Sequence, residues 1–278
     1  MPDNSLAFVF PGQGSQKVGM LAAAHESFQA VRDTFAEASN ALDYDMWELV
    51  QNGEQESLNL TETTQPVLLT SSVALWRAWQ EQGGSQPAVM AGHSLGEFSA
   101  LVCADSLGFA DAVRLVRQRG AFMQSAVPVG EGAMAAILGL EDDQINSICE
   151  TISATGEGIV AAVNFNSPGQ VVIAGHTAAV NAAIEKLKEA GAKRAMPLPV
   201  SAPFHTDLMK PAGERLADAF ADIAIASPGV PVVHNVHAQT ETDPEIIREL
   251  LVLEIFSPVL WTGCMRAIAA GGATCVVD

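Results

Sequence analysis

Basic residues are scarce in this chain of 278 residues, in which 14 Lys and Arg face 32 Asp and Glu for a formal net charge of −18. Binding to a nucleic-acid backbone needs a basic surface, so this balance argues against nucleic-acid binding and against adsorption on an anionic membrane. Hydrophobic residues reach 49% and charged residues 17%, which excludes intrinsic disorder. The length allows one large domain or two modest ones.

Paired cysteines and long apolar runs are also missing. The four cysteines form no CxxC pair, so neither a zinc site nor a disulfide framework is expected, and a reducing compartment is indicated. No run approaches about 18 apolar residues, and the first residues lack the basic region of a signal peptide. We expect a cytoplasmic protein with no bound metal and no membrane contact.

Short apolar runs at residues 6–10 and 87–91 are each stopped by a glycine-containing loop, which is typical of buried strands. Helical patterns occupy residues 28–41, 65–82 and about 111–124. Strands that alternate with helices predict an α/β fold with a mostly parallel sheet.

The order of predicted strands and helices changes in the middle of the chain. There the sequence pattern predicts the order β-α-β-β-α-β, which is the ferredoxin-like unit, inserted into the larger α/β domain. We therefore expect a small subdomain over residues 129–197, and a larger one built from residues 1–128 and 198–278. The predicted strands are 132–140, 158–164, 170–175 and 192–198, and the predicted helices are 142–153 and 177–190.

The segment from Gly92 to Gly96 reads GHSLG and fits the G-x-S-x-G pattern. Its glycines allow a sharp turn from a buried strand into a helix, and this turn presents the Ser94 hydroxyl at a helix N-terminus. Ser94 is therefore a candidate nucleophile, and the alternative is a purely structural turn.

A serine nucleophile needs a base, and His205 is the best placed of the six histidines. It follows a predicted strand end and precedes a helix, although an ordinary loop histidine remains the alternative. No acid between Ser94 and His205 follows a buried strand, so we predict a Ser–His dyad in which a main-chain carbonyl orients the imidazole.

Arg119 lies within the apolar stripe of its helix, whereas Arg114 and Arg117 lie on the opposite side. An inward arginine must be paired, because burying it alone costs several kcal/mol. Either an internal carboxylate pairs with it, or it anchors the carboxylate of a substrate. The second role suits an acyltransferase for a dicarboxylic half-thioester, and a simple esterase would not need it.

The loop at residues 10–16 is glycine-rich and follows the first strand, but it lacks the spacing of a dinucleotide fingerprint and the lysine of a P-loop. A loop of this kind beside the nucleophile predicts main-chain N–H donors for an oxyanion hole.

Taken together, the motifs resemble the malonyl-CoA:acyl carrier protein transacylase family. They occur in the family's order over almost the whole chain. They are FVFPGQGSQ at Phe8–Gln16, TQP at Thr64–Pro66, GHSLGE at Gly92–Glu97, QRG at Gln118–Gly120, NFNSPGQVVIAG at Asn164–Gly175, APFH at Ala202–His205 and SPVLWT at Ser257–Thr262.

The resemblance implies an α/β-hydrolase-like core with an inserted ferredoxin-like subdomain. It implies that Ser94 takes up the malonyl group, that His205 is the general base and acid, and that Arg119 pairs with the malonyl carboxylate. Main-chain N–H groups of Gln13 and Leu95 would form the oxyanion hole. Further substrate contacts are implied for Gln65, Asn164 and Phe204.

The resemblance also implies that the carbonyl of residue 254 orients His205. That position is commonly glutamine in the family and is Glu254 here. If only the carbonyl is used, the change should be mild, whereas a carboxylate close to a charged His205 would raise the pKa of that histidine.

The implied reaction moves malonyl from malonyl-CoA to the phosphopantetheine thiol of acyl carrier protein, for fatty acid synthesis. It needs no bound cofactor, and we expect a monomer. The alternatives are service to a polyketide synthase, a serine thioesterase or esterase, and a non-catalytic docking protein. Because the carrier is acidic, we expect it to dock on a basic cluster formed by Lys186, Lys188, Lys193 and Arg194.

Overall fold

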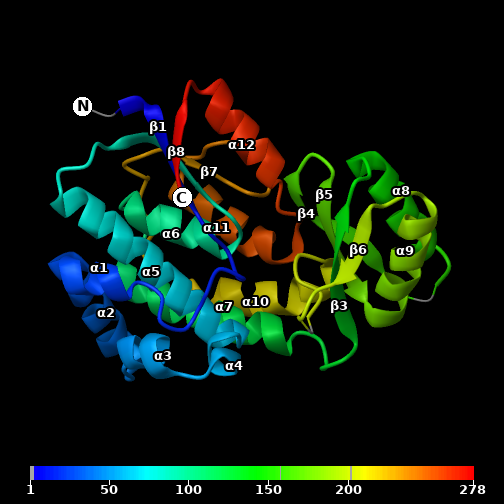
Figure 1. The fold of residues 1–278 in the computed structure, drawn as a ribbon, viewed down its shortest axis with the longest axis horizontal. Helices are drawn as coiled ribbons and strands as arrows, with labels where there is room; N and C mark the ends of the chain where they lie inside the picture. The colour runs from blue at the N-terminus through cyan, green and yellow to red at the C-terminus, as the bar shows by residue number, and fades with distance from the viewer. Residues whose placement is uncertain (1–2, 157, 201) are drawn as a thin grey trace.

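The computed structural model describes residues 3–156, 158–200 and 202–278. Two lobes are visible in Figure 1, each built around its own four-stranded sheet. The larger lobe contains both chain termini, and the smaller one contains the middle of the chain.

The sheet of the larger lobe is parallel and has the strand order β7-β2-β1-β8. The strands are β1 (Asp3–Phe10), β2 (Pro87–Gly92), β7 (Val232–Val233) and β8 (Cys275–Val277). From Leu6 to Phe10 every residue of β1 lies in the core, with at most 8% of its surface exposed. The apolar runs of β1 and β2 therefore mark strands that are covered on both faces, as expected of a parallel sheet.

Helices surround this sheet. The longest, α5 (Thr61–Glu81), packs against α7 (Phe109–Ser125). The others are α1 (Ala22–Ser27), α2 (Gln29–Leu42), α3 (Met46–Asn52), α4 (Gln55–Leu58), α6 (Leu95–Cys103), α10 (Lys210–Ala219), α11 (Pro244–Leu253) and α12 (Trp261–Ala270), with short 3₁₀ turns η1 (Asp207–Met209) and η2 (Glu254–Phe256).

The smaller sheet is antiparallel, with the strand order β4-β5-β3-β6. Its helices α8 and α9 lie beside it in Figure 1. In chain order the elements are β3 (Gly132–Leu138), α8 (Asp142–Ser153), β4 (Val160–Ser167), β5 (Gln170–His176), α9 (Thr177–Glu189) and β6 (Arg194–Pro197). This is the predicted β-α-β-β-α-β order, and the predicted α/β fold class is confirmed. The exact subdomain boundaries stay a prediction.

Several element boundaries differ from the sequence prediction, among them the start of α5 and the end of β4. Helix α5 begins at Thr61, four residues before the predicted start, with Pro66 inside it. Strand β4 covers Val160–Ser167, where the prediction was 158–164. It continues to the turn before Gln170 because its last residues pair with β5, as in the partners Phe165 and Val171.

Main-chain hydrogen bonds join the two lobes near the end of β4. Val259, which precedes α12, donates to Val163 O (2.8 Å), and Phe165 N donates to Val259 O (3.0 Å). The Thr262 hydroxyl donates to Phe165 O (2.9 Å). These contacts hold residues 163–165 of the smaller sheet's outer strand against the larger lobe. Among the helices that the structure describes, none is long and apolar enough to cross a membrane.

Candidate active site

Ser94 lies on a tight turn between β2, which ends at Gly92, and α6, which begins at Leu95. Its backbone has φ 50° and ψ −111°, a conformation that non-glycine residues rarely adopt. A Cβ on Gly92 would lie 1.8 Å from the main-chain carbon of Gly96, so the strand and helix can approach this closely only with glycine. The turn has the strained geometry of a nucleophile elbow.

A buried hydrogen-bond network supports the elbow from behind. The Ser94 N–H donates to Asn235 Oδ1 (2.7 Å), and Asn235 Nδ2 donates to Gly92 O (2.7 Å). The Asn235 N–H donates to Glu97 Oε2 (2.8 Å), whose other oxygen lies 2.7 Å from His234 Nδ1. Asn235, Glu97 and His234 have no exposed surface. The hydrogen bonds among these buried groups fix one conformation, because breaking them would leave further polar groups unpaired and away from water.

His205 lies beside Ser94, with Nε2 3.0 Å from the serine Oγ. Its Nδ1 lies 2.8 Å from the main-chain carbonyl of Glu254. Since a carbonyl can only accept, Nδ1 carries the ring proton and Nε2 is left to accept from the Ser94 hydroxyl. The dyad geometry predicted from the sequence is therefore the geometry observed.

Burial, and after it the charge of the neighbouring Arg119 guanidinium, lowers the pKa of His205 to about 3. The hydrogen bond to the Glu254 carbonyl acts in the opposite direction but is outweighed. The rise in pKa considered for a nearby Glu254 carboxylate is not found, because the side chain is turned toward Arg119. A neutral imidazole at pH 7 is the form that can accept a proton.

Arg119 reaches the same point from α7. Its Nη2 donates to Ser94 Oγ (3.1 Å) and to Glu254 Oε2 (3.0 Å), while Nη1 donates to Gln65 Oε1 (2.9 Å). Gly120 makes this approach possible, because a Cβ there would lie 2.4 Å from Thr61 O on α5. Of the two readings of Arg119, the internal ion pair is present, and the guanidinium also lines the cavity that contains Ser94.

The cavity has a volume of about 310 Å³ and lies between the two lobes. Gln13 and Leu95, the predicted oxyanion-hole residues, line it near Ser94. Residues from the smaller sheet, including Asn164, form the facing wall, and Phe204 lies beside His205. All the residues implied by the family resemblance are therefore gathered here: Gln13, Gln65, Ser94, Leu95, Arg119, Asn164, Phe204 and His205, with Glu254 directly behind. Their roles remain predictions.

Sequence reasoning missed Asn235, Glu97 and His234. Asn235 follows β7, and strand ends in α/β sheets collect functional groups, which is the signal that was available. However, β7 has only two residues, too few for a strand prediction. His93, the residue before Ser94, has its Nε2 2.8 Å from Asn166 Oδ1 and lines the cavity together with Ser94.

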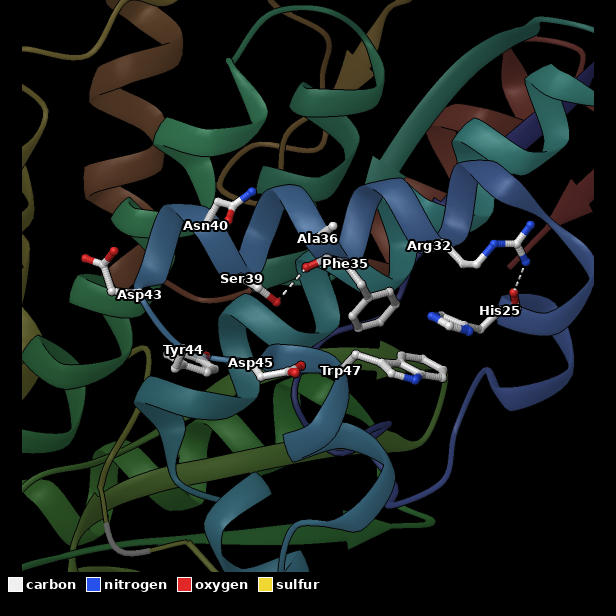
Figure 2. A pocket seen from close by; sticks show the side chains of 10 residues that line it. All are labelled: His25, Arg32, Phe35, Ala36, Ser39, Asn40, Asp43, Tyr44, Asp45 and Trp47. Atoms are coloured by element: carbon white, nitrogen blue, oxygen red, sulfur yellow. Dashed lines mark hydrogen bonds between the residues drawn. The ribbon is translucent and has the colours of Figure 1, made fainter.

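A larger hollow of about 570 Å³ lies elsewhere, over α2 and α3 (Figure 2). His25 stacks on Trp47 there, with ring centroids 3.7 Å apart. Ser39 lines the same hollow, but it donates to Phe35 O (2.8 Å) and accepts from Met46 N (3.0 Å). Its hydroxyl is thus committed to the main chain, and no histidine is hydrogen-bonded to it among the described residues. This hollow lacks the paired nucleophile and base found at Ser94.

Among the described residues 3–156, 158–200 and 202–278, no group of three or more His, Cys, Asp or Glu side chains could hold a metal ion. The cavity instead offers a hydroxyl, an imidazole and a guanidinium within hydrogen-bonding distance of one another. A parallel α/β sheet with a strained serine elbow and a histidine partner defines the class of fold that carries out acyl transfer through serine.

Comparison with known proteins agrees with this class. The family described as the acyl transferase domain matches residues 7–278. The malonyl CoA-acyl carrier protein transacylase of Salmonella typhimurium is 60% identical over 96% of this chain and 85% of its own length. The chain belongs to the acyl transferase domain family, as the motifs predicted.

Solved structures give the same result. An acyl carrier protein S-malonyltransferase from Vibrio cholerae has a TM-score of 0.95 and 54% identity, covering 98% of this chain and 88% of that one. A complex of a type II polyketide synthase acyl carrier protein with its malonyl-transacylase, PlMCAT:AntF, has a TM-score of 0.96 and 51% identity, covering 99% of this chain and 88% of that one.

Proposed function

We propose that this protein transfers the malonyl group from malonyl-CoA to the phosphopantetheine thiol of acyl carrier protein, through a malonyl ester on Ser94. The observation that carries the proposal is the contact set of the Ser94 hydroxyl. It lies 3.0 Å from a histidine that can take its proton and 3.1 Å from an arginine that can hold a carboxylate. The names of the relatives support the same substrate pair.

The first half-reaction begins when Ser94 Oγ gives its proton to His205 Nε2 and attacks the thioester carbonyl. The carbon–sulfur bond breaks, and the departing CoA sulfur takes the proton from His205. Main-chain N–H groups of Gln13 and Leu95 would hold the oxyanion that forms in between. The carrier thiol then attacks the malonyl ester by the same steps in reverse, which makes the mechanism ping-pong.

Arg119 would select the acyl group by pairing with the malonyl carboxylate. Gln65 holds the guanidinium in place through its Oε1. Phe204, beside His205, would crowd the carbon between the two carbonyls and disfavour a methyl branch there. Asn164 would contribute a polar contact from the facing wall. No metal or bound cofactor enters these steps, and we expect a monomer in the cytoplasm that supplies fatty acid synthesis.

Intact-mass measurement after mixing with malonyl-CoA tests the proposal directly. The wild-type chain should gain one malonyl adduct, mapped to Ser94 by peptide sequencing, and Ser94→Ala should gain none while keeping its melting temperature. The adduct should then disappear when the thiol form of acyl carrier protein is added. An adduct at another residue would overturn the assignment.

The competing activity is hydrolysis of malonyl-CoA by a serine thioesterase. Release of free malonate in the absence of carrier protein, at a rate equal to transfer in its presence, would favour that activity. Carrier proteins of fatty acid and polyketide synthesis, compared at equal concentration, separate the two biosynthetic roles. The solved complex with a polyketide carrier makes this comparison necessary.

A further inference from the structure

The ion pair between Arg119 and Glu254 occupies one side of the guanidinium that is proposed to hold the substrate. Its N–O distance is 3.0 Å, and the two side chains are 1% and 0% exposed. The main chain of Glu254 is held by the turn η2 and by the hydrogen bond from His205, and its side chain is fully buried. The buried carboxylate is therefore a fixed neighbour of the substrate-binding arginine.

A malonyl group on Ser94 would bring a second carboxylate to the same guanidinium. Two carboxylates that share one buried cation repel each other, and such pairs respond by holding a proton. The Oε1 atom of Glu254 can take this proton, because it has no hydrogen-bond partner among the described residues. Arg119 cannot relieve the conflict, since a guanidinium keeps its charge in proteins.

Resting on the proposed function, we propose that Glu254 takes up a proton from solvent when a dicarboxylic acyl group binds at Arg119, and that Glu254 thereby sets how strongly a charged acyl group is preferred over an uncharged one. Glu254 is a positioning residue, because it acts through Arg119 and does not touch the substrate itself.

The surroundings of Glu254 favour the protonated form. Burial raises the pKa of Glu254 well above the usual range, and Glu97 on α6 raises it further, while Arg119 acts in the opposite direction. His205 contacts the main-chain carbonyl, and the Cys264 thiol on α12 is buried nearby with its pKa raised to about 12. His234 lies behind, bonded to Glu97.

Helices α10 and α11 also pack against the turn η2. The charged side chains of α10 are exposed, as is Glu249 on α11. Arg248 donates instead to the main-chain carbonyl of Ile223 (3.1 Å). Among the described residues of these two helices, no charged group is recorded in contact with the Glu254 carboxylate, so Arg119 is the cation that matters.

This arrangement gives a definite pH dependence. Where Glu254 is ionised in the free protein, binding of malonyl requires one proton from solvent, so each rise of one pH unit weakens binding up to about tenfold. At lower pH the carboxyl is already protonated and this dependence vanishes. An acetyl group brings no second charge, so its binding should not depend on Glu254 in this way.

Proton uptake can be measured without turnover in the Ser94→Ala variant. Malonyl-CoA is titrated into this variant by calorimetry, in buffers of different ionisation enthalpy, from about pH 5.5 to about pH 9 to span the ordinary and raised carboxyl range. We expect an uptake that rises toward one proton within this range. Acetyl-CoA, and the double variant Ser94→Ala/Glu254→Gln with malonyl-CoA, should show none. Equal uptake for both thioesters at every pH would overturn the proposal.

Kinetics of the single variant Glu254→Gln give the second test. Glutamine keeps the main-chain carbonyl and a side-chain acceptor for Arg119 while removing the charge. The ratio of kcat/KM for malonyl-CoA to that for acetyl-CoA should rise at least about tenfold at high pH, through a lower KM for malonyl-CoA. Glu249→Gln, which removes an exposed carboxylate, is the matched control and should leave the ratio unchanged.

The outcomes separate this proposal from the proposed function. If wild-type protein forms the malonyl adduct on Ser94 but the ratio does not change in Glu254→Gln, only the role of Glu254 fails. If wild-type protein forms no adduct with malonyl-CoA, the proposed function fails first. If Glu254→Gln does not fold, the proton uptake of Ser94→Ala still decides.

Discussion

Acidification should destabilise this protein through His205, because the folded protein keeps this imidazole neutral. The pKa of His205 falls from 6.5 to about 3 on folding, and burial is the main cause. Above pH 6.5 the side chain is neutral in both the folded and the unfolded chain, so it adds no pH dependence. Below that pH the unfolded chain takes up a proton that the folded protein cannot, and the free energy of unfolding falls.

The size of this effect follows from the pKa shift. Each pH unit between the two pKa values removes about 1.4 kcal/mol, so the full loss from pH 6.5 down to about pH 3 approaches 5 kcal/mol. A loss of this size is comparable with the whole stability of many domains. It is complete only below the folded pKa, where both states bind the proton.

Urea unfolding of wild type and of His205→Asn over about pH 4.5 to about pH 7.5, which brackets the ordinary histidine pKa, isolates this effect. Asparagine accepts a positive φ better than most residues, which matters because His205 has φ 64°. Its amide can also donate to the Glu254 carbonyl. Carboxylates titrate in both proteins and cancel in the difference, which should tilt by about 1.4 kcal/mol per pH unit below pH 6.5. A difference that stays constant would refute the reasoning.

Three further predictions concern the cavity and its surroundings. In a Glu254→Gln background, which avoids leaving a buried carboxylate alone, Arg119→Ala should lower kcat/KM for malonyl-CoA by about 10² to 10³ and spare acetyl-CoA, and equal losses for both would make Arg119 structural. Charge reversal at the exposed Lys193 and Arg194 should raise the KM for acyl carrier protein, whereas reversal at the ion-paired lysines of α9 should change it less, and an unchanged KM would move the docking surface elsewhere. Asn235→Ala should lower the melting temperature and kcat together, because it leaves the Ser94 N–H without its acceptor. An unchanged kcat would show that the turn at Ser94 keeps its conformation without the Asn235 side chain.

Helix α5 shows why some boundaries could not be predicted from the sequence. The helical pattern in the sequence predicted a start at Gln65, next to Pro66, and proline is favoured in the first turn of a helix. The structure begins the helix at Thr61, where tertiary packing against α7 outweighs the local signal. In the smaller lobe the local signal was sufficient for helix α8, which begins and ends at the predicted residues.

Some residues of the candidate site could be identified from the sequence, and others could not. The sequence could mark Ser94 and Arg119, because one lies in a local motif and the other interrupts an apolar helix face. It could not show that Arg119 meets Glu254, which is 135 positions away in the chain. Asn235 was also out of reach, because its importance comes from contacts with Gly92 and Ser94 that only the folded sheet creates.

The hydrogen bonds between Val259 and the end of β4 have a mechanical consequence. They hold one rim of the cavity shut beside Asn164, while the reactive groups Ser94 and His205 both belong to the larger lobe. Tilting of the smaller lobe about this pinned edge would widen the opposite rim without changing the distance between serine and histidine. This hinge would let a long thioester substrate enter the cavity while Ser94 and His205 keep their relative positions.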